Sequence, residues 1–114
     1  MDDCIFCKII KKDIPSAIVY EDERIIAFDD INPQAPVHTL IIPKEHYNSL
    51  KDIPKEHSDL LGHILIVARD IAEKKQIAGT GYRIVLNTGE NSGQEVLHIH
   101  FHVLGGRRMT WPPG

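Results

Sequence analysis

Apolar residues recur along this chain at the helical period in one long segment and one short segment. From Pro54 to Lys75 the apolar positions follow the 3.6-residue repeat, and Pro54 suits a first helical turn. The short segment can be capped by Asp2 or Asp3 and is stopped at Pro15. The apolar positions are Leu60, Leu61, Ile64, Leu65, Ala68, Ile71 and Ala72 in the long segment, and Ile5, Phe6, Ile9 and Ile10 in the short one.

Five other segments are short and rich in apolar or β-branched residues, which predicts strands. A polar stretch over 21–23 separates the first two and indicates a hairpin, and Pro43 closes the third. The order is one short helix, three strands, one long helix and two strands, which predicts an α+β fold with a five-stranded antiparallel sheet. The strand segments are 18–20, 24–28, 37–42, 82–87 and 96–104.

Length and composition indicate a single domain that spans residues 1–114. The 42% apolar and 25% charged residues are typical of a globular chain and argue against disorder. A formal charge of −3 without a basic stripe argues against a nucleic-acid partner. The first residues are acidic where a signal peptide would be basic, and no apolar run approaches about 18 residues. We therefore expect a cytoplasmic protein with no membrane partner.

Histidine is the residue type in excess, and three of the seven histidines alternate over residues 98–102. On a strand, His98, His100 and His102 share one face, and the apolar residues that alternate with them share the other. Three interpretations are open. The strand face is simply exposed, or His100, His102 and a third ligand hold a catalytic zinc ion, or a neutral imidazole acts as a nucleophile on phosphorus.

The segment before these histidines, residues 87–94, is polar and contains two glycines. Its backbone N–H groups and the Gln94 amide are suited to hold phosphate oxygens. Taken alone, the segment is equally well explained as an ordinary hairpin connection. Together with the three histidines it favours phosphate chemistry over zinc chemistry.

The segment His98–Leu104 matches the His-x-His-x-His signature, and the chain resembles the histidine triad family of nucleotide hydrolases and transferases. The resemblance spans nearly the whole chain. The Trp-Pro-Pro-Gly end, residues 111–114, is similar to the branch of purine nucleoside phosphoramidases. The other matching segments are 4–10, 27–36, 38–44 and 104–107.

This resemblance implies an enzyme that cleaves the P–N bond of purine nucleoside 5′-phosphoramidates and gives a nucleoside monophosphate such as AMP or GMP. In the family pattern His100 is the nucleophile and forms a nucleotidyl-histidine intermediate. His98 supports its orientation, His102 lies against the phosphate and leaving group, and His38 is an additional active-site histidine. No metal ion is required for the chemical step.

The resemblance also implies a nucleotide site, in which Asp30 holds the ribose hydroxyls beside Ile31. From the residues alone, Asp30 is better explained as a cap of its own turn, and the two phenylalanines Phe6 and Phe28 as simple core. Position 95 departs from the family, because Glu95 stands where the animal enzymes have a serine; an ionised carboxylate donates no hydrogen bond. The implied phosphate site is Asn87, Gly93, Gln94 and Glu95, and the implied base pocket is Phe6, Phe28, Ile9 and Leu40.

The pair Cys4 and Cys7 has the spacing of metal ligands, but two thiolates do not complete a tetrahedral shell. Inert thiols and a redox motif are the alternatives. Bacterial members of the family with this Cys-x-x-Cys pair bind a structural zinc ion through a later histidine and the first histidine of the triad. Those positions are His46 and His98 in this chain.

The resemblance further implies a homodimer whose sheets join edge to edge, with the C-terminal tail and Trp111 near the partner's site. Two other functions stay open. One is a dinucleoside polyphosphate hydrolase, against which the Trp-Pro-Pro-Gly end argues. The other is a nucleotide-binding regulatory or interaction protein with incidental hydrolysis, which Glu95 keeps open.

Overall fold

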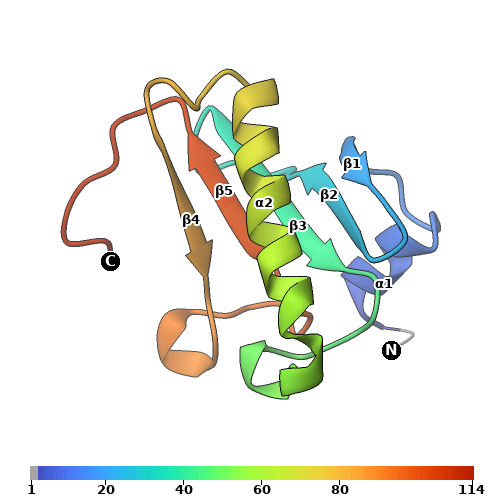
Figure 1. Ribbon diagram of the computed structural model, residues 1–114. Coiled ribbons are helices and arrows are strands. Elements are labelled where there is room, and N and C mark those ends of the chain that lie inside the picture. Colours follow the sequence, from blue (N-terminus) through green and yellow to red (C-terminus); the bar gives the residue numbers. More distant parts are fainter. Residues whose placement is uncertain (1–2) are drawn as a thin grey trace.

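Five antiparallel strands form one sheet, with a long helix packed on one of its faces (Figure 1). The chain is described by a computed structural model that covers residues 3–114. The strand order β1-β2-β3-β5-β4 confirms the predicted α+β fold and leaves β1 and β4 at the edges. The helices are α1 (Ile5–Ile10) and α2 (Ser58–Lys74), and the strands are β1 (Ile18–Glu21), β2 (Ile25–Asp29), β3 (Val37–Pro43), β4 (Tyr82–Leu86) and β5 (Phe101–Gly105).

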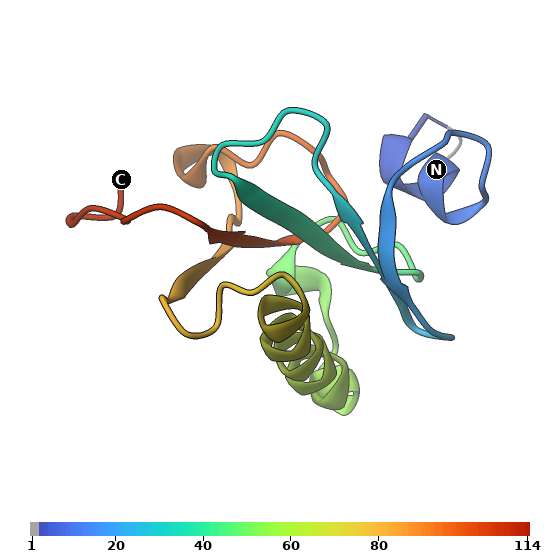
Figure 2. The same ribbon diagram turned by 90° about the horizontal axis from the view of Figure 1, so that it is seen from above.

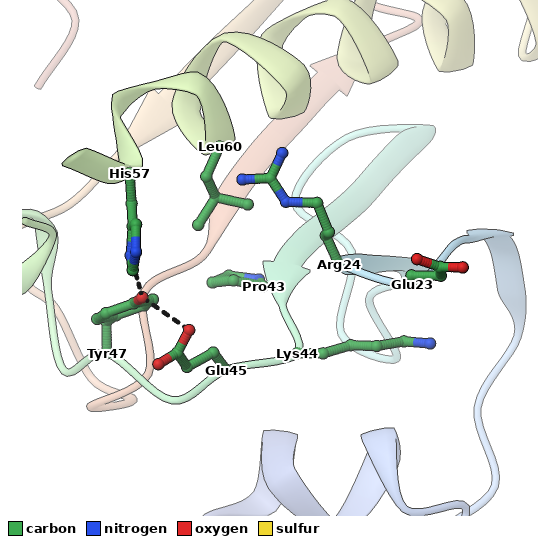
Figure 3. A pocket seen from close by; sticks show the side chains of 8 residues that line it. All are labelled: Glu23, Arg24, Pro43, Lys44, Glu45, Tyr47, His57 and Leu60. Atoms are coloured by element: carbon green, nitrogen blue, oxygen red, sulfur yellow. Dashed lines mark hydrogen bonds between the residues drawn. The ribbon is translucent and has the colours of Figure 1, made fainter.

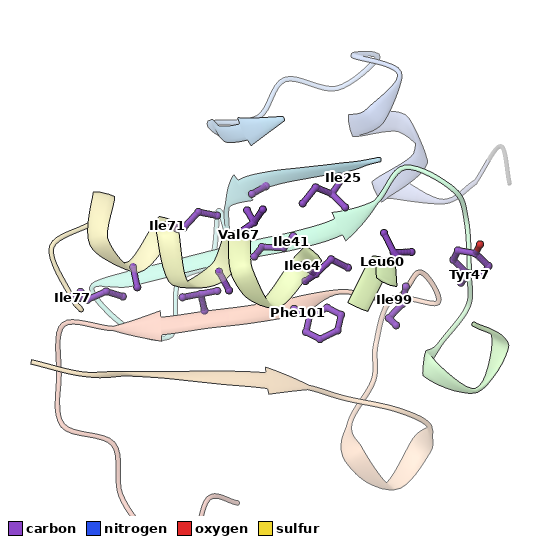
Figure 4. Close-up of a cluster of buried hydrophobic side chains, with 14 residues drawn as sticks. Ile25, Ile41, Tyr47, Leu60, Ile64, Val67, Ile71, Ile77, Ile99 and Phe101 are labelled. Carbon is purple, nitrogen blue, oxygen red and sulfur yellow. The ribbon is translucent and has the colours of Figure 1, made fainter. Parts of the chain in front are cut away.

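The two helices lie on opposite sides of the sheet, so the central strands are buried on both faces (Figure 2). Successive strand residues point to opposite faces, and Ile25 and Ile41 therefore pack against α2 while Ile26 and Ile42 pack on the α1 side. Figure 4 shows the larger cluster, in which α2 contributes one apolar stripe. This near-continuous apolar character of β2 and β3 is what two covered faces require.

Both helices begin differently from the sequence prediction. A 3₁₀ turn, Lys55–His57, follows Pro54, and α2 itself starts at Ser58. The cap of α1 is Cys4, whose Sγ accepts a hydrogen bond from the Cys7 N–H at 3.5 Å. The prediction of Asp3 as the cap is wrong because the helix starts at Ile5, and Asp2 lies outside the described residues. Within residues 3–114, no helix has the length and apolar character needed to cross a bilayer.

The last strand is shorter than predicted, because it begins at Phe101 and not at residue 96. Pairing with β3 stops at Ile41 opposite Phe101, and the N–H of Ile99 donates to the carbonyl of Tyr47 at 2.7 Å instead. The alternation of faces nevertheless continues outside the strand, since Ile99, Phe101 and Val103 all lie in the core under α2. His98 and His100 therefore lie in the irregular segment that leads into β5.

Two glycines let β5 end close to its neighbours. A Cβ atom on Gly105 would lie 2.6 Å from Ile77 Cδ1, and one on Gly106 would lie 2.8 Å from Pro36 Cβ. Gly106 also has a φ of 88°, which L side chains rarely adopt. This close approach fixes the loop that precedes β3, and with it Asp30 and His38, against the end of β5.

Candidate functional site

Four histidines gather on the α1 side of the sheet, where β3 lies next to β5. The rings of His100 and His102 have centroids 4.9 Å apart, and those of His38 and His102 are 5.2 Å apart. His98 is fully buried, and His38 and His100 are 6% and 7% exposed. An exposed strand face that happens to carry histidines is therefore the wrong interpretation.

The protonation state of His100 follows from its hydrogen bond. Its Nδ1 lies 2.8 Å from the carbonyl oxygen of His98. A carbonyl oxygen accepts hydrogen bonds and donates none, so Nδ1 carries the hydrogen and Nε2 keeps its lone pair. The His98 carbonyl thus orients the ring so that Nε2 is available as a nucleophile when the imidazole is neutral.

The protons of His38 and His102 are fixed by a chain of donors. The N–H of Gln34 donates to His38 Nδ1 at 3.0 Å, so His38 carries its hydrogen on Nε2. This Nε2 lies 2.9 Å from His102 Nδ1 and donates to it, which leaves the hydrogen of His102 on Nε2. Nε2 of His102 is buried and finds no hydrogen-bond partner among residues 3–114.

Burial keeps these histidines neutral near pH 7. Desolvation lowers the pKa of His38 and of His100, and it lowers the pKa of His98 and of His102 to about 4. The Asp30 carboxylate opposes this effect, since its Oδ2 lies 3.6 Å from His38 Nε2, but the loss of hydration outweighs it. Neutral rings are the state that the hydrogen-bond chain requires.

A second group of side chains meets where α1 begins, beside the first triad histidine. The donor atoms of Cys4, Cys7, His46 and His98 all lie within 4.8 Å of one another. Cys7 Sγ is 3.3 Å from His46 Nδ1 and 3.6 Å from His98 Nδ1, and Cys4 Sγ is 3.5 Å from His98 Nδ1. Bonds of about 2.0–2.3 Å to a tetrahedral zinc ion place sulfur and nitrogen ligands about 3.5 Å apart. The spacing of this cluster fits zinc.

The two histidines of this cluster are also held in the tautomer that a metal ion needs. His98 Nε2 donates to the Pro43 carbonyl at 2.8 Å, and His46 Nε2 donates to Asn48 Oδ1 at 2.8 Å. Each Nδ1 therefore presents a lone pair to the thiols. Desolvation, and next the hydrogen bond that the Cys7 thiol donates to Cys4, raises the pKa of the Cys7 thiol, and a bound cation would offset this cost. The four residues fit a closed structural zinc site.

Sequence reasoning missed Asn48 and the backbone acceptors of this site. Asn48 lies two residues after His46, a spacing that carries no recognised signal, and backbone carbonyls have no side-chain signature at all. The alternative of a catalytic zinc ion on the last two triad histidines is not favoured. Among the residues that the structure describes, the converging metal-ligand group contains neither His100 nor His102.

Comparison with known proteins agrees with this geometry. The family model described as scavenger mRNA decapping enzyme C-term binding matches residues 3–110. A solved HIT family hydrolase from Legionella pneumophila Philadelphia 1 is 52% identical, with a TM-score of 0.95 over 98% of this chain and all of that one. This chain belongs to the histidine triad family.

Two histidine triad relatives carry more specific names. The purine nucleoside phosphoramidase of Escherichia coli strain K12 is 51% identical over 108 residues, which are 95% of this chain and 91% of that protein. The 14 kDa zinc-binding protein of Zea mays is 53% identical over 112 residues, which are 96% of this chain and 87% of that protein. The likeness therefore extends over nearly the full length of all three proteins.

The four residues of the implied base pocket lie together on the α1 side. Each of them is at most 7% exposed. The ring of Phe6 meets the ring of His100 edge-on, with centroids 5.1 Å apart, and contacts Phe28 in the same way at 5.6 Å. This apolar layer therefore adjoins His100 and supports α1. Its members, with Ile26 and Ile42, are Phe6, Ile9, Phe28 and Leu40.

The glycine-bearing segment before the histidines folds as a 3₁₀ turn, Glu90–Ser92, that ends at Gly93 with a φ of 81°. Gln94 ties this segment to its surroundings. Its Oε1 accepts from the Gly89 N–H at 2.9 Å, and its Nε2 donates to the carbonyls of Asn48 at 2.7 Å and Val96 at 3.1 Å. Both amide hydrogens are thus engaged within the protein, and so are the backbone N–H groups of Gly89, Gly93 and Gln94.

The remaining predicted residues lie at the surface or the margin of the site. Asp30 caps its own turn through Oδ1, which accepts from the Asn32 N–H at 2.9 Å, while Oδ2 lies near His38. Ile31 is 94% exposed and Trp111 is 81% exposed. The other two are Asn87, which is half-buried after β4, and Glu95, which is exposed.

A cavity of about 260 Å³ lies next to the start of α2 and contains no triad histidine (Figure 3). Tyr47 donates from its hydroxyl to Glu45 Oε2 at 2.9 Å, and the same hydroxyl lies 3.0 Å from His57 Nδ1. These contacts brace the segment after β3. His57 is therefore occupied by a structural contact away from the triad.

Proposed function

We propose that this protein hydrolyses the P–N bond of purine nucleoside 5′-phosphoramidates and releases a nucleoside monophosphate. The observation that carries the proposal is the hydrogen bond from His100 Nδ1 to the His98 carbonyl, because in the neutral ring it leaves the Nε2 lone pair free. Burial lowers the pKa of His100 and so keeps the ring neutral. The similarity to a HIT family hydrolase and to a purine nucleoside phosphoramidase supports the reaction class.

In the first step, Nε2 of His100 attacks the α-phosphorus, and the bond between phosphorus and the amine nitrogen breaks. The departing amine takes up one proton. The N–H groups of His98 and His100 are engaged by carbonyls, so the N–H of His102 is the triad donor that is left to hydrogen-bond the leaving nitrogen. The proton itself comes from solvent, because a neutral His102 that gave up its only N–H proton would become an imidazolate.

In the second step, water attacks the same phosphorus, and the bond between phosphorus and His100 Nε2 breaks. The hydroxyl group of this water stays on the nucleotide. The remaining proton of the water is released and replaces the proton that the amine took up in the first step. Neither step requires a metal ion, and a zinc ion at the neighbouring cluster contributes stability by holding α1 against the His98 segment.

We place the ribose hydroxyls at Asp30, beside Ile31, because Oδ2 is not used by the Asp30 turn. The phosphate lies at the segment from Asn87 to Gly93, where the N–H groups at the start of the turn Glu90–Ser92 suit an anion. Glu95 contributes its backbone there and not its side chain. The purine stacks on the apolar layer that contains Phe6, and weak discrimination between adenine and guanine follows from its lack of polar groups.

We further propose a homodimer that forms along β4, the edge strand next to β5. All five residues of β4 are half-buried, and the outer edge of a strand offers unpaired backbone groups. The tail runs outward past β4 (Figure 1), and Arg83 of β4 contacts it. Trp111 in this tail would then lie near the partner's site.

Rapid mixing with an adenosine phosphoramidate, followed by intact-protein mass spectrometry, tests the covalent route. We expect a transient adenylyl adduct that maps to His100. The variant His100→Asn should form no adduct and lose at least about a thousandfold in turnover, because no other group replaces the nucleophile. Calorimetric titration with AMP should still detect binding.

The control variant is His57→Asn, which changes an exposed histidine outside the triad and should form the adduct as the wild type does. An adduct on His100→Asn would exclude His100 as the nucleophile. Faster hydrolysis of a dinucleoside polyphosphate than of the phosphoramidate would favour the related polyphosphate hydrolase. Tight AMP binding with neither adduct nor product would favour the binding protein.

A further inference from the structure

The metal cluster of Cys4, Cys7, His46 and His98 is not equally buried on all sides. Cys7 and His98 are buried, whereas Cys4 and His46 are partly exposed. Both of these exposed members line one cavity of about 430 Å³. The cavity therefore reaches two of the four residues of the cluster.

The lining of this cavity combines apolar walls with two carboxylates. Ile5 and Leu97 are 47% and 61% exposed and form part of the walls. Asp3 and Glu95 supply the carboxylates, and both are exposed. Because both residues line the cavity, their negative charge favours the entry of a cation.

We propose that this cavity is the passage by which a divalent metal ion enters and leaves the cluster, with Asp3 and Glu95 as capturing carboxylates and Cys4 and His46 as the first ligands to exchange. The inference rests on the fit of the cluster to a metal ion and is independent of the proposed hydrolysis. It also assigns a role to the glutamate at position 95, where the animal enzymes have a serine.

The chemistry of the ligands supports this order of events. Carboxylate oxygens bind divalent cations weakly and exchange quickly, whereas thiolates and imidazoles bind zinc more firmly. An ion held first at Glu95 can therefore pass to Cys4 and His46 and then to the buried pair. One negative charge at the entrance raises the rate of cation entry by about two- to five-fold at low salt, and salt removes the effect.

The test compares Glu95→Gln with Glu90→Gln, which removes the same charge from an exposed position outside the cavity lining. In the first measurement, zinc is withdrawn from the loaded chain by EDTA, an anionic chelator. In the second, the chain is freed of metal and its thiols are reduced, and the thiolate-to-cobalt absorption then measures the rate at which it takes up cobalt. We expect Glu95→Gln to speed removal and to slow uptake, each by about two- to five-fold at low salt.

Faster removal of zinc together with slower uptake of cobalt distinguishes an effect on this passage from a loosened fold. A loosened fold would speed the removal of zinc without slowing the uptake of cobalt. Identical rates for Glu95→Gln and Glu90→Gln, or a Glu95→Gln effect that persists at 0.5 M salt, would overturn the role of Glu95. A second variant, Leu97→Trp, narrows the cavity and should slow both removal and uptake several-fold. Unchanged rates in that variant would overturn the passage itself.

Discussion

The histidines of the two sites other than His38 use one ring nitrogen to fix their position and leave the other for chemistry. His98 is held through Nε2, so its Nδ1 meets the thiols of the metal cluster. His100 is held through Nδ1, so its Nε2 is the nucleophile in the proposed reaction. Two histidines separated by one residue thus serve different chemistry because different nitrogens are hydrogen-bonded.

The low pKa of His102 predicts a pH dependence of stability. Desolvation, followed by the neighbouring charges on His100 and His38, lowers this pKa to about 4, and Asp30 opposes the shift. The unfolded chain therefore takes up more protons than the folded chain between about pH 6.5 and pH 4. The free energy of unfolding should fall as the pH falls through this range, by up to about 1.4 kcal/mol per pH unit for one such group.

Urea denaturation at several pH values checks this prediction with His102→Gln. Glutamine cannot be protonated, so the variant should lose about 1–2 kcal/mol less stability than the wild type between pH 7 and pH 5. The variant His57→Gln, at an exposed position, is the control. Parallel curves for the wild type and His102→Gln would contradict a buried neutral imidazole at this position.

At the scale of elements, two connections meet beside the metal cluster. The segment after β3 carries His46 and Asn48, and the segment before β5 carries Gln94. Asn48 joins them, because its side chain accepts from His46 and its backbone carbonyl accepts from Gln94. The metal cluster and the implied phosphate segment are thus connected through one residue.

The variant Asn48→Ala should weaken zinc binding by about 10- to 100-fold, because the tautomer and orientation of His46 lose their support. Competition with a fluorescent zinc chelator measures the change. Asn91→Ala, in the exposed 3₁₀ turn, is the matched control and should bind zinc as the wild type does. An affinity for zinc that is equal in both variants would show that Asn48 does not orient His46.

The elements themselves were largely predictable, whereas some of their ends were not. Alternation placed Ile99 and Phe101 in the core correctly, although β5 starts only at Phe101. The pairing between β3 and β5 stops at Phe101 because the N–H of Ile99 donates to the carbonyl of Tyr47 instead, and these two residues are far apart in the sequence. Likewise, a thiol caps α1, which the usual preference for Asp, Asn, Ser or Thr did not predict.

At the scale of the whole molecule, the C-terminal tail contributes little to the fold of its own chain. Arg83 donates to the Thr110 carbonyl at 3.0 Å and lies 6.0 Å from the centre of the Trp111 ring. Exposed contacts of this kind are worth little to stability. The tail is therefore available for another role, and in the proposed homodimer that role lies at the partner's site.

A chain that ends at Arg108 should keep its melting temperature within a few degrees and its affinity for AMP. We expect its turnover to change by about tenfold, and unequally for small and bulky amines, because the tail would contact the leaving group and not the nucleotide. Kinetics with two phosphoramidates and light scattering for the oligomeric state measure these effects. Turnover that is the same as in the full chain for both amines would rule out a catalytic role for the tail.

The sequence by itself determined the elements, the two faces of the histidine segment and the family, because periodicity and motif spacing are local properties of the chain. It also named Cys4, Cys7, His46 and His98 through the family resemblance, and the structure brings those four together. Only the tertiary structure decided which nitrogen of each imidazole carries the hydrogen. For His98 and His102 that choice depends on the Pro43 carbonyl and the His38 ring, which come from distant segments of the chain. For His38 and His46 the partners Gln34 and Asn48 are close in sequence, but they face the imidazoles only in the folded loops.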